Sequence, residues 1–180
     1  ASYTDGGANP ESVASAATTP VANVNDLPTG LVTIAGTSTQ GEILTASQAL
    51  ADEDGLGLIG FQWRSNGTDI VGATSSTFTL TQAEVGTVID VVASYTDQQG
   101  TPESVASAGT VAVANVNDVP TGSVVISGIP TEDQILTASN TLVDPDGLGA
   151  ISYQWQSNGV DIGGATNATI TLGQAQGLTF

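Results

Sequence analysis

The sequence predicts an all-β fold, in which antiparallel β-sandwiches of about seven strands each follow one another in an extended array. Short β-rich runs recur about every 8–12 residues between turn residues, and no stretch has a helical period. The whole pattern then repeats along the chain. A composition of 39% hydrophobic residues with 22 glycines fits this class and argues against disorder, despite a net charge of −17.

A repeat of 92 residues dominates the sequence. The segment Ala22–Asp26 recurs as Ala114–Asp118, and Trp63 recurs as Trp155 at the same spacing. About six in ten of the aligned positions are identical, as expected of a tandem array of one structural unit. The period is too long for one turn of a solenoid and suits an autonomous β domain.

The linker-like sequence NVNDLP marks the joint between units and divides the chain into three parts. Residues 1–22 are interpreted as the C-terminal strands of a preceding repeat, residues 23–114 as a complete repeat, and residues 115–180 as a repeat without its last strands. Two explanations stay open. The preferred one is that the chain is a window on a longer array; the other is that residues 1–22 of one chain complete the truncated repeat of a neighbour.

The first half of the complete repeat contains three predicted strands. Leu31–Ala35 and Glu42–Ser47 are short β-rich runs bounded by turn residues. Ile59–Ser65 alternates between apolar and polar residues, which places Phe61 and Trp63 on one face. A tryptophan at the centre of such a strand, here and in the second copy, predicts a core side chain rather than a platform for sugar stacking.

The second half of the repeat begins with Asn66-Gly67, a hairpin turn in which both residues tolerate positive φ. Strands are then expected at Ser76–Thr81, at Thr87–Tyr95 and within Ser104–Val113. The alternation places Phe78 and Leu80 inward. In the next strand it separates one face, made of Ile89, Val91, Ala93 and Tyr95, from the opposite face, made of Val88, Asp90 and Val92.

The residues that the chain lacks exclude much chemistry. Without Cys there is no disulfide, thiolate nucleophile or zinc–cysteine site, and without His the commonest general base is missing. A polyanion whose one cation is Arg64 should repel nucleic acid and anionic lipid. No apolar run reaches the roughly 18 residues of a membrane span, so no membrane insertion is expected. The remaining hard oxygen ligands favour Ca²⁺.

The order of the predicted strands, Trp63 on the third strand, and LTQAEVGTVIDV before the penultimate strand resemble an immunoglobulin-like (Ig-like) domain. More narrowly, NVNDLP, DEDGLG, FQWRSNGTDIVGAT and SYTDQQGTPES resemble the tandem Ig-like and cadherin-like repeats of giant bacterial surface proteins. That class includes the stalks of RTX-type adhesins and biofilm-matrix proteins. The resemblance implies secretion to the cell surface, Ca²⁺ near the domain joints, and a role as spacer or fibre.

An Ig-like topology places the linker and two loops at the same end of a repeat. Carboxylates there would lie close together, and two unit charges about 4 Å apart repel by roughly 4 kcal/mol at an effective dielectric near 20. About one or two Ca²⁺ ions per joint would relieve that repulsion. The candidate ligands are Asn25, Asp26, Asp52, Asp54, Asp97 and Glu103 in the complete repeat, Asn117, Asp118, Asp144 and Asp146 in the next, and Asp5 and Glu11 in the first segment.

A simpler alternative for DEDGLG is a surface turn whose Asp side chains cap backbone N–H groups while Gly55 adopts positive φ. Glu53 is replaced by Pro145 in the second copy, so it is expected to be solvated rather than a ligand.

The predicted function is structural and not enzymatic: an extracellular stalk or filament of Ca²⁺-stiffened repeats, whose partners are neighbouring repeats and other copies of itself. Paired carboxylates could indicate a glycosidase, but aromatic subsites are missing and the whole unit is repeated. Two alternatives remain, namely a module that binds a glycan or a host protein, and a fibre polymerised by strand complementation between chains.

Overall fold

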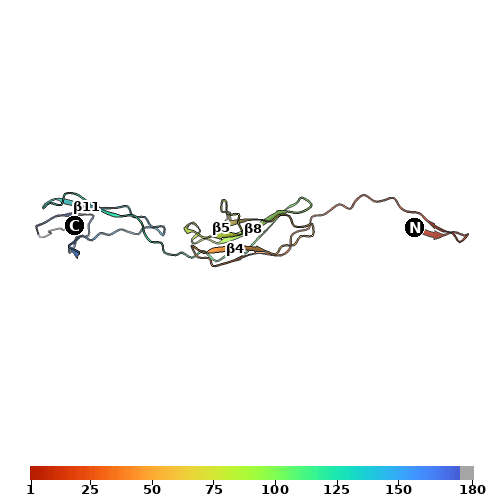
Figure 1. Cartoon of the computed structure of the whole chain (residues 1–180), viewed down its shortest axis with the longest axis horizontal. Coiled ribbons are helices and arrows are strands. Elements are labelled where there is room, and N and C mark those ends of the chain that lie inside the picture. The colour runs from red at the N-terminus through yellow and green to blue at the C-terminus, as the bar shows by residue number, and fades with distance from the viewer. Residues whose placement is uncertain (175–180) are drawn as a thin grey trace.

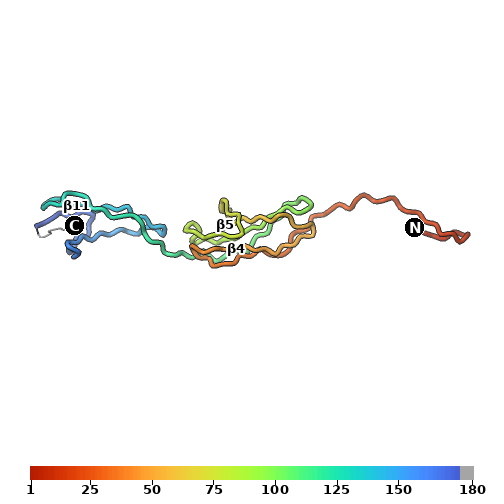
Figure 2. The backbone as a smooth tube through the Cα atoms, in the orientation of Figure 1, coloured from red at the N-terminus to blue at the C-terminus, as the bar shows by residue number. Residues whose placement is uncertain are grey.

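The computed structural model describes residues 1–174 as an elongated, essentially all-β chain, which confirms the predicted fold class at that level (Figure 1). The last six residues of the predicted third part, 175–180, lie outside the described residues. A two-stranded hairpin, β1 (Ser2–Thr4) and β2 (Pro10–Ser12), stands at the N-terminus. An extended segment without strands connects it to the next unit, and the tube in Figure 2 shows that the units succeed one another along the long axis.

We call residues 23–114 the first repeat and the described residues from 115 onward the second repeat. The strands of the first repeat are β3 (Val32–Ala35), β4 (Ile43–Gln48), β5 (Gly60–Ser65), β6 (Thr68–Asp69), β7 (Thr77–Thr79), β8 (Ile89–Thr96) and β9 (Pro102–Ala106). A single 3-10 turn, η1 (Gln82–Glu84), precedes β8. The strands of the second repeat are β10 (Val124–Ser127), β11 (Ile135–Asn140), β12 (Gln156–Ser157), β13 (Val160–Asp161) and β14 (Thr169–Thr171).

Two antiparallel sheets form the first repeat, one in the order β3-β4-β7 and the other in the order β6-β5-β8-β9. Side chains from both sheets share one core, so the arrangement is that of a sandwich. Trp63 is completely buried at its centre, its ring stacks on Phe78 with centroids 5.7 Å apart, and its Nε1 donates to the Ser75 carbonyl over 2.8 Å. The indole is therefore a core group, as its strand position predicts.

Strand β8 has the cleanest alternation in the molecule. Ile89, Val91, Ala93 and Tyr95 are buried, whereas Ser94 and Thr96 between and beyond them are exposed. The strand is central in its sheet, pairing with β5 on one side and β9 on the other. The alternation expected from the sequence is thus confirmed, and the face that carries Ile89 is the buried one.

The main difference from the expected strands occurs after β7. The predicted strand Ser76–Thr81 ends early because Thr81 begins η1 as its N-cap: its Oγ1 accepts from the Ala83 N–H over 3.2 Å, and the Glu84 carboxylate accepts from the Thr81 N–H over 2.8 Å. This reciprocal capping box leaves Glu84 buried but hydrogen-bonded.

The C-terminal edge of the first repeat runs on beyond β9 as far as the next linker. Ser107, Thr110 and Val113 donate their N–H groups to the carbonyls of Val91, Ile89 and Thr87, at 2.8–2.9 Å. Isolated parallel bridges then join Val85 to Val113 and Thr39 to Ala114. The last residues of the repeat, Val113 and Ala114, are therefore paired in parallel with segments that come earlier in the chain.

The second repeat reproduces the first over the part that is described. Trp155 is buried with Leu136, Ala138 and Leu172, and its Nε1 donates to the Asn167 carbonyl over 2.9 Å, at the positions equivalent to Trp63 and Ser75. Within the described residues no strands correspond to β8 and β9. Val124 is consequently 56% exposed, whereas its counterpart Val32 is 4% exposed.

Replacing Trp63 with Ala should destabilise the first repeat by about 3–5 kcal/mol, because a fully buried indole leaves a large cavity. Urea unfolding followed by circular dichroism measures the change. Val71→Ala is the matched control, since Val71 is 99% exposed and its truncation should change stability by less than about 0.5 kcal/mol. Equal effects of the two substitutions would contradict the assigned core.

Candidate functional site

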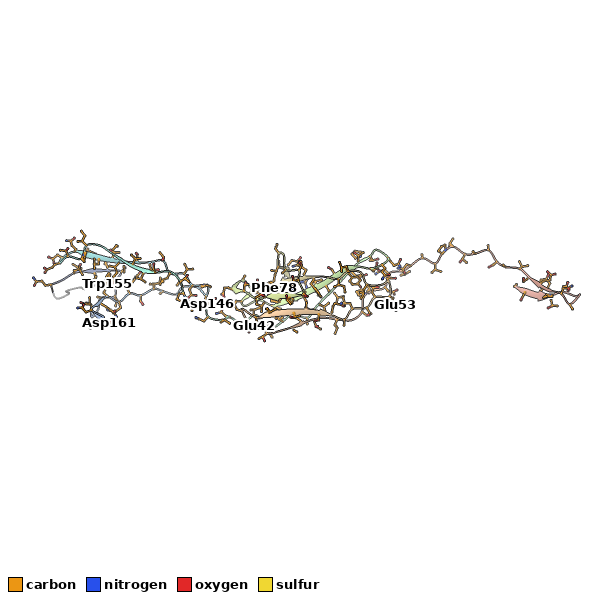
Figure 3. The ribbon with its side chains drawn as sticks, in the orientation of Figure 1. Glu42, Glu53, Phe78, Asp146, Trp155 and Asp161 are labelled. Atoms are coloured by element: carbon orange, nitrogen blue, oxygen red, sulfur yellow. The ribbon has the colours of Figure 1, made fainter. Side chains whose placement is uncertain are left out.

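The sequence-predicted ligands of the first repeat lie together at its N-terminal end. We call this cluster, made of Asn25, Asp26, Asp52, Asp54, Asp97 and Glu103, the acidic pole. It is assembled from the linker, the loop after β4 and the hairpin between β8 and β9. Glu53, on the same loop, marks this end of the repeat in Figure 3, and its own side chain is exposed.

Two hydrogen bonds tie the linker to the acidic pole. The Asp26 N–H donates to Asp54 Oδ2 over 2.8 Å, and Asn25 Nδ2 donates to Glu103 Oε1 over 2.8 Å. A pair of backbone bonds between Thr29 and Ala51, at 2.8 and 2.9 Å, fixes the end of the linker against the same loop. The linker is thus attached to the domain rather than leading freely into it.

Asp52 accepts hydrogen bonds on both of its oxygens. Its Oδ1 takes the Asp54 N–H over 2.8 Å, and its Oδ2 takes the Tyr95 hydroxyl over 2.5 Å. Gly55 has a φ of +89°, and a Cβ there would lie 2.6 Å from the side chain of Gln98. These contacts are those of the capped-turn alternative, in which carboxylates satisfy local donors.

Tyr95 is a site residue for which the sequence predicted only a position on one face of a strand. Burial raises the pKa of Tyr95 above its ordinary value, and so do its hydrogen bond to Asp52 and the nearby charges of Asp52, Glu103 and Asp97. A buried tyrosine usually finds a partner for its hydroxyl, so a Tyr at the end of a core strand beside an acidic loop is a signal that could have identified it.

Asp97 is the most deeply buried carboxylate of the acidic pole, with a relative exposure of 5%. Its Oδ1 accepts from the N–H groups of Gln99 and Thr101, at 2.9 and 2.7 Å. Its Oδ2 is also buried, and no hydrogen-bond donor among the described residues reaches it. An unpartnered buried carboxylate oxygen is costly, so it marks the place where a water or a cation would be stabilised.

The second repeat builds the same linker contact from its own residues. The Asp118 N–H donates to Asp146 Oδ2 over 2.7 Å, and the Asp146 N–H donates to Asp144 Oδ1 over 2.9 Å. Asn117 differs from Asn25, because its Nδ2 donates to the Asp118 carbonyl over 2.9 Å. The structure therefore brings these four predicted residues together as well.

The candidates in the N-terminal hairpin make only local contacts. Asp5 Oδ1 accepts from the N–H groups of Asn9 and Gly7, at 2.8 and 2.9 Å, and these bonds, that of Asn9 first, lower the pKa of Asp5. Glu11 lies in β2 opposite Tyr3. In residues 1–174 no hydrogen bond joins either carboxylate to the other candidates.

Across the described part of the chain, no group of three or more acidic side chains is arranged as a ready-made metal site. The donors of the acidic pole nonetheless suit Ca²⁺ in kind, because all are carboxylate or amide oxygens and one of them, Asp97 Oδ2, is buried without a partner.

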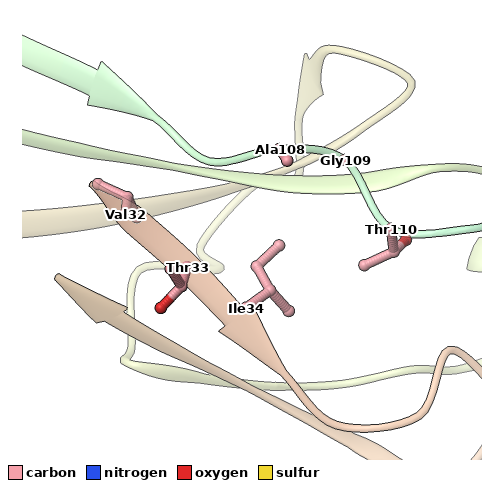
Figure 4. A pocket seen from close by; sticks show the side chains of 6 residues that line it. All are labelled: Val32, Thr33, Ile34, Ala108, Gly109 and Thr110. Atoms are coloured by element: carbon pink, nitrogen blue, oxygen red, sulfur yellow. The ribbon is translucent and has the colours of Figure 1, made fainter.

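One hollow on the first repeat carries no charged group. It is a groove of about 240 Å³ between β3 and the segment after β9, lined by Val32, Thr33, Ile34, Ala108, Gly109 and Thr110 (Figure 4). Its lining offers neither a titratable group nor a metal ligand.

Comparisons of the chain with family models, with curated proteins and with solved structures give no match. In residues 1–174 there is also no helix with the length and apolar character needed to cross a membrane.

Tyr95→Phe should reduce the loss of stability at alkaline pH. A pKa that is raised in the folded state adds stability that is present below the ordinary tyrosine pKa of about 10 and is lost as the pH rises above it. The chain has no His, Cys or Lys to obscure this titration. Melting temperatures between about pH 8 and pH 12 measure the effect.

The control for this prediction is Tyr3→Phe, because Tyr3 is 60% exposed. At neutral pH the Tyr95 variant should also be less stable than wild type, because Asp52 Oδ2 loses its hydroxyl donor. Parallel pH profiles for wild type and Tyr95→Phe would show that the hydroxyl is not the titrating group.

Proposed function

We propose that the chain is a non-catalytic part of an extracellular stalk or fibre, in which tandem Ig-like repeats are stiffened by Ca²⁺ bound at their acidic poles. The observation that carries the proposal is the recurrence of one linker contact. The backbone N–H of Asp26 donates to the carboxylate of Asp54, and 92 residues further on the backbone N–H of Asp118 donates to the carboxylate of Asp146. A linker contact that is rebuilt in successive units is what a long, regular spacer requires.

The Ig-like assignment is supported by the two sheets of the first repeat. One sheet holds β3, β4 and β7, the other holds β5, β6, β8 and β9, and a buried tryptophan on β5 packs between them. Two such layers around a core tryptophan are also typical of an Ig-like sandwich, which supports the proposal. The missing cysteine pair is replaced by aliphatic contacts such as those of Leu44 and Val91.

Ca²⁺ would be held by Asp97 through its unpartnered Oδ2, with Asp52 and Glu103 as the neighbouring carboxylates that also surround the Tyr95 hydroxyl. The ion supplies positive charge to a chain that has one cation of its own. Extracellular modules typically bind Ca²⁺ at about 10⁻⁴–10⁻³ M, so such a site is filled outside a cell and empty inside it.

The stiffening follows from the way the linker is attached. Asn25 bonds to Glu103 and Asp26 bonds to Asp54, so the linker rests on the same loops that the ion would hold. Without the ion the carboxylates repel and these loops loosen, which frees the linker. With the ion the loops and the linker become one rigid end. The natural partners are then neighbouring repeats of the same fibre, on the surface of a bacterium as the sequence resemblance implies.

Ca²⁺ at millimolar concentration should raise the melting temperature of the chain by several degrees, and EDTA should reverse the rise. Asp97→Asn should abolish the response and melt in EDTA at or above the temperature of wild type, because it removes a buried charge whose Oδ2 has no hydrogen-bond donor. Differential scanning calorimetry measures both effects. An unchanged melting curve in EDTA and in Ca²⁺ would refute the proposed site.

Glu53→Gln is the matched control, since Glu53 is exposed on the same loop and should leave the response intact. Asp54→Asn and Asp146→Asn should each weaken Ca²⁺ binding measured by isothermal titration calorimetry. If Glu53→Gln weakens binding more than Asp54→Asn does, the ligand assignment is wrong.

A further inference from the structure

The joint between the two repeats is gripped by one side chain of the first repeat, that of Gln40. Its Oε1 accepts from the Val116 N–H over 3.1 Å, and its Nε2 donates to Asp118 Oδ2 over 2.8 Å. Its backbone N–H donates to the Ala114 carbonyl over 2.9 Å, while the Ala114 N–H donates to the Ser38 carbonyl over 2.8 Å. One residue thus holds the linker at three points.

The same contacts reach into the second repeat through Asp118. Its carboxylate accepts a hydrogen bond from Gln40 Nε2, and its backbone N–H donates to Asp146 Oδ2. Asp118 is therefore bonded to both repeats at once, and the chain of contacts Gln40–Asp118–Asp146 crosses the joint. Figure 3 shows Glu42, two residues after Gln40, and Asp146 at the facing ends of the two repeats.

We infer that Gln40 fixes the orientation of the second repeat on the first, and that it does so without a cation because its side chain is a neutral amide. An amide offers a donor to the Asp118 carboxylate and an acceptor to the Val116 N–H at the same time. We call this arrangement the amide clamp. It does not use the unpartnered Asp97 Oδ2 of the proposed Ca²⁺ site, which lies at the opposite end of the first repeat, although Asp118 is also a candidate Ca²⁺ ligand of the second repeat.

The two copies carry different residues at this position, and the second residue would make the clamp depend on a cation. In the 92-residue alignment Gln40 corresponds to Glu132, so the chain itself contains the acidic alternative. An ionised Glu has only acceptors, and at position 40 it would face the Asp118 carboxylate with no proton to share. Two facing carboxylates repel unless a cation lies between them. The residue at this position therefore decides whether a joint is self-sufficient or needs a cation.

The test measures the distance between the two repeats in the whole chain. The chain has no cysteine, so Thr68→Cys and Val160→Cys, at equivalent exposed hairpin positions, can carry a pair of spin labels. Pulsed electron–electron double resonance should give one narrow distribution of the distance between the two labels in EDTA. Gln40→Ala should at least double its width, whereas Gln99→Ala, in the loop at the far end of the repeat, should leave it unchanged.

Gln40→Glu separates the two parts of the inference. In EDTA its distribution should be as broad as that of Gln40→Ala, and millimolar Ca²⁺ or Mg²⁺ should narrow only the Glu variant. Asp118→Ala removes the same contact from the other side and should reproduce Gln40→Ala, which guards against a folding defect in either variant.

Three results would overturn the inference. An unchanged width in both Gln40→Ala and Asp118→Ala would show that the clamp does not orient the repeats. A Gln40→Glu joint that ignores cations would show that the residue at this position does not decide the need for a cation. A wild-type distribution that is broad in EDTA would show that the joint needs a cation despite its amide. The distances other than those of the cation-treated Gln40→Glu variant are measured in EDTA, so failure of the proposed Ca²⁺ site would leave them unaffected.

Discussion

Eighteen carboxylates and a single guanidinium make up the charged side chains of this protein, so nearly every acid must find a partner that carries no charge. Arg64 forms a salt bridge with Asp90, and the charge of Asp69 also acts on it. The remaining buried acids use backbone N–H groups, hydroxyls and amides, as Glu84 does at Thr81 and Asp52 does at Tyr95. Because the donors come from linkers and loops, satisfying the acids also fastens those segments to the sheets. The hydrogen bonds that hold the joints are thus the same ones that satisfy carboxylates for which the chain has no cation.

Much of the fold could be predicted from the sequence because period-2 alternation and burial have a direct physical link. In β8 every second residue, from Ile89 to Tyr95, is inside, and Trp63 occupies the core position that its flanking residues indicate. Strand ends could not be predicted as well, because they depend on which groups compete for the terminal hydrogen bonds. Thr81 illustrates this: its residue type permits a strand, but a glutamate three residues later converts it into the cap of η1.

The candidate site was predictable in position and much less so in its contacts. Chain topology brings the linker and two loops together, and this could be argued from strand order alone. The repulsion expected there omitted the local donors, which reach Asp52, Asp54 and Glu103. Nothing in the sequence distinguishes Asp97 from the other acids, since its unpartnered oxygen results from the way the hairpin folds over it. The role of Gln40 could not be predicted either, because it depends on whether its side chain reaches Val116 and Asp118 across the joint.

The parallel bridges that close the first repeat have a consequence for how it carries load. The segment around Thr39 and the segment around Ala114 run in the same direction, and Val85 pairs with Val113 beside them. Tension along the long axis enters at one end of the first segment and leaves at the opposite end of the second. It therefore strains these hydrogen bonds side by side, in shear, so that several must break together. A sandwich closed by an antiparallel terminal pair would instead unzip one bond at a time.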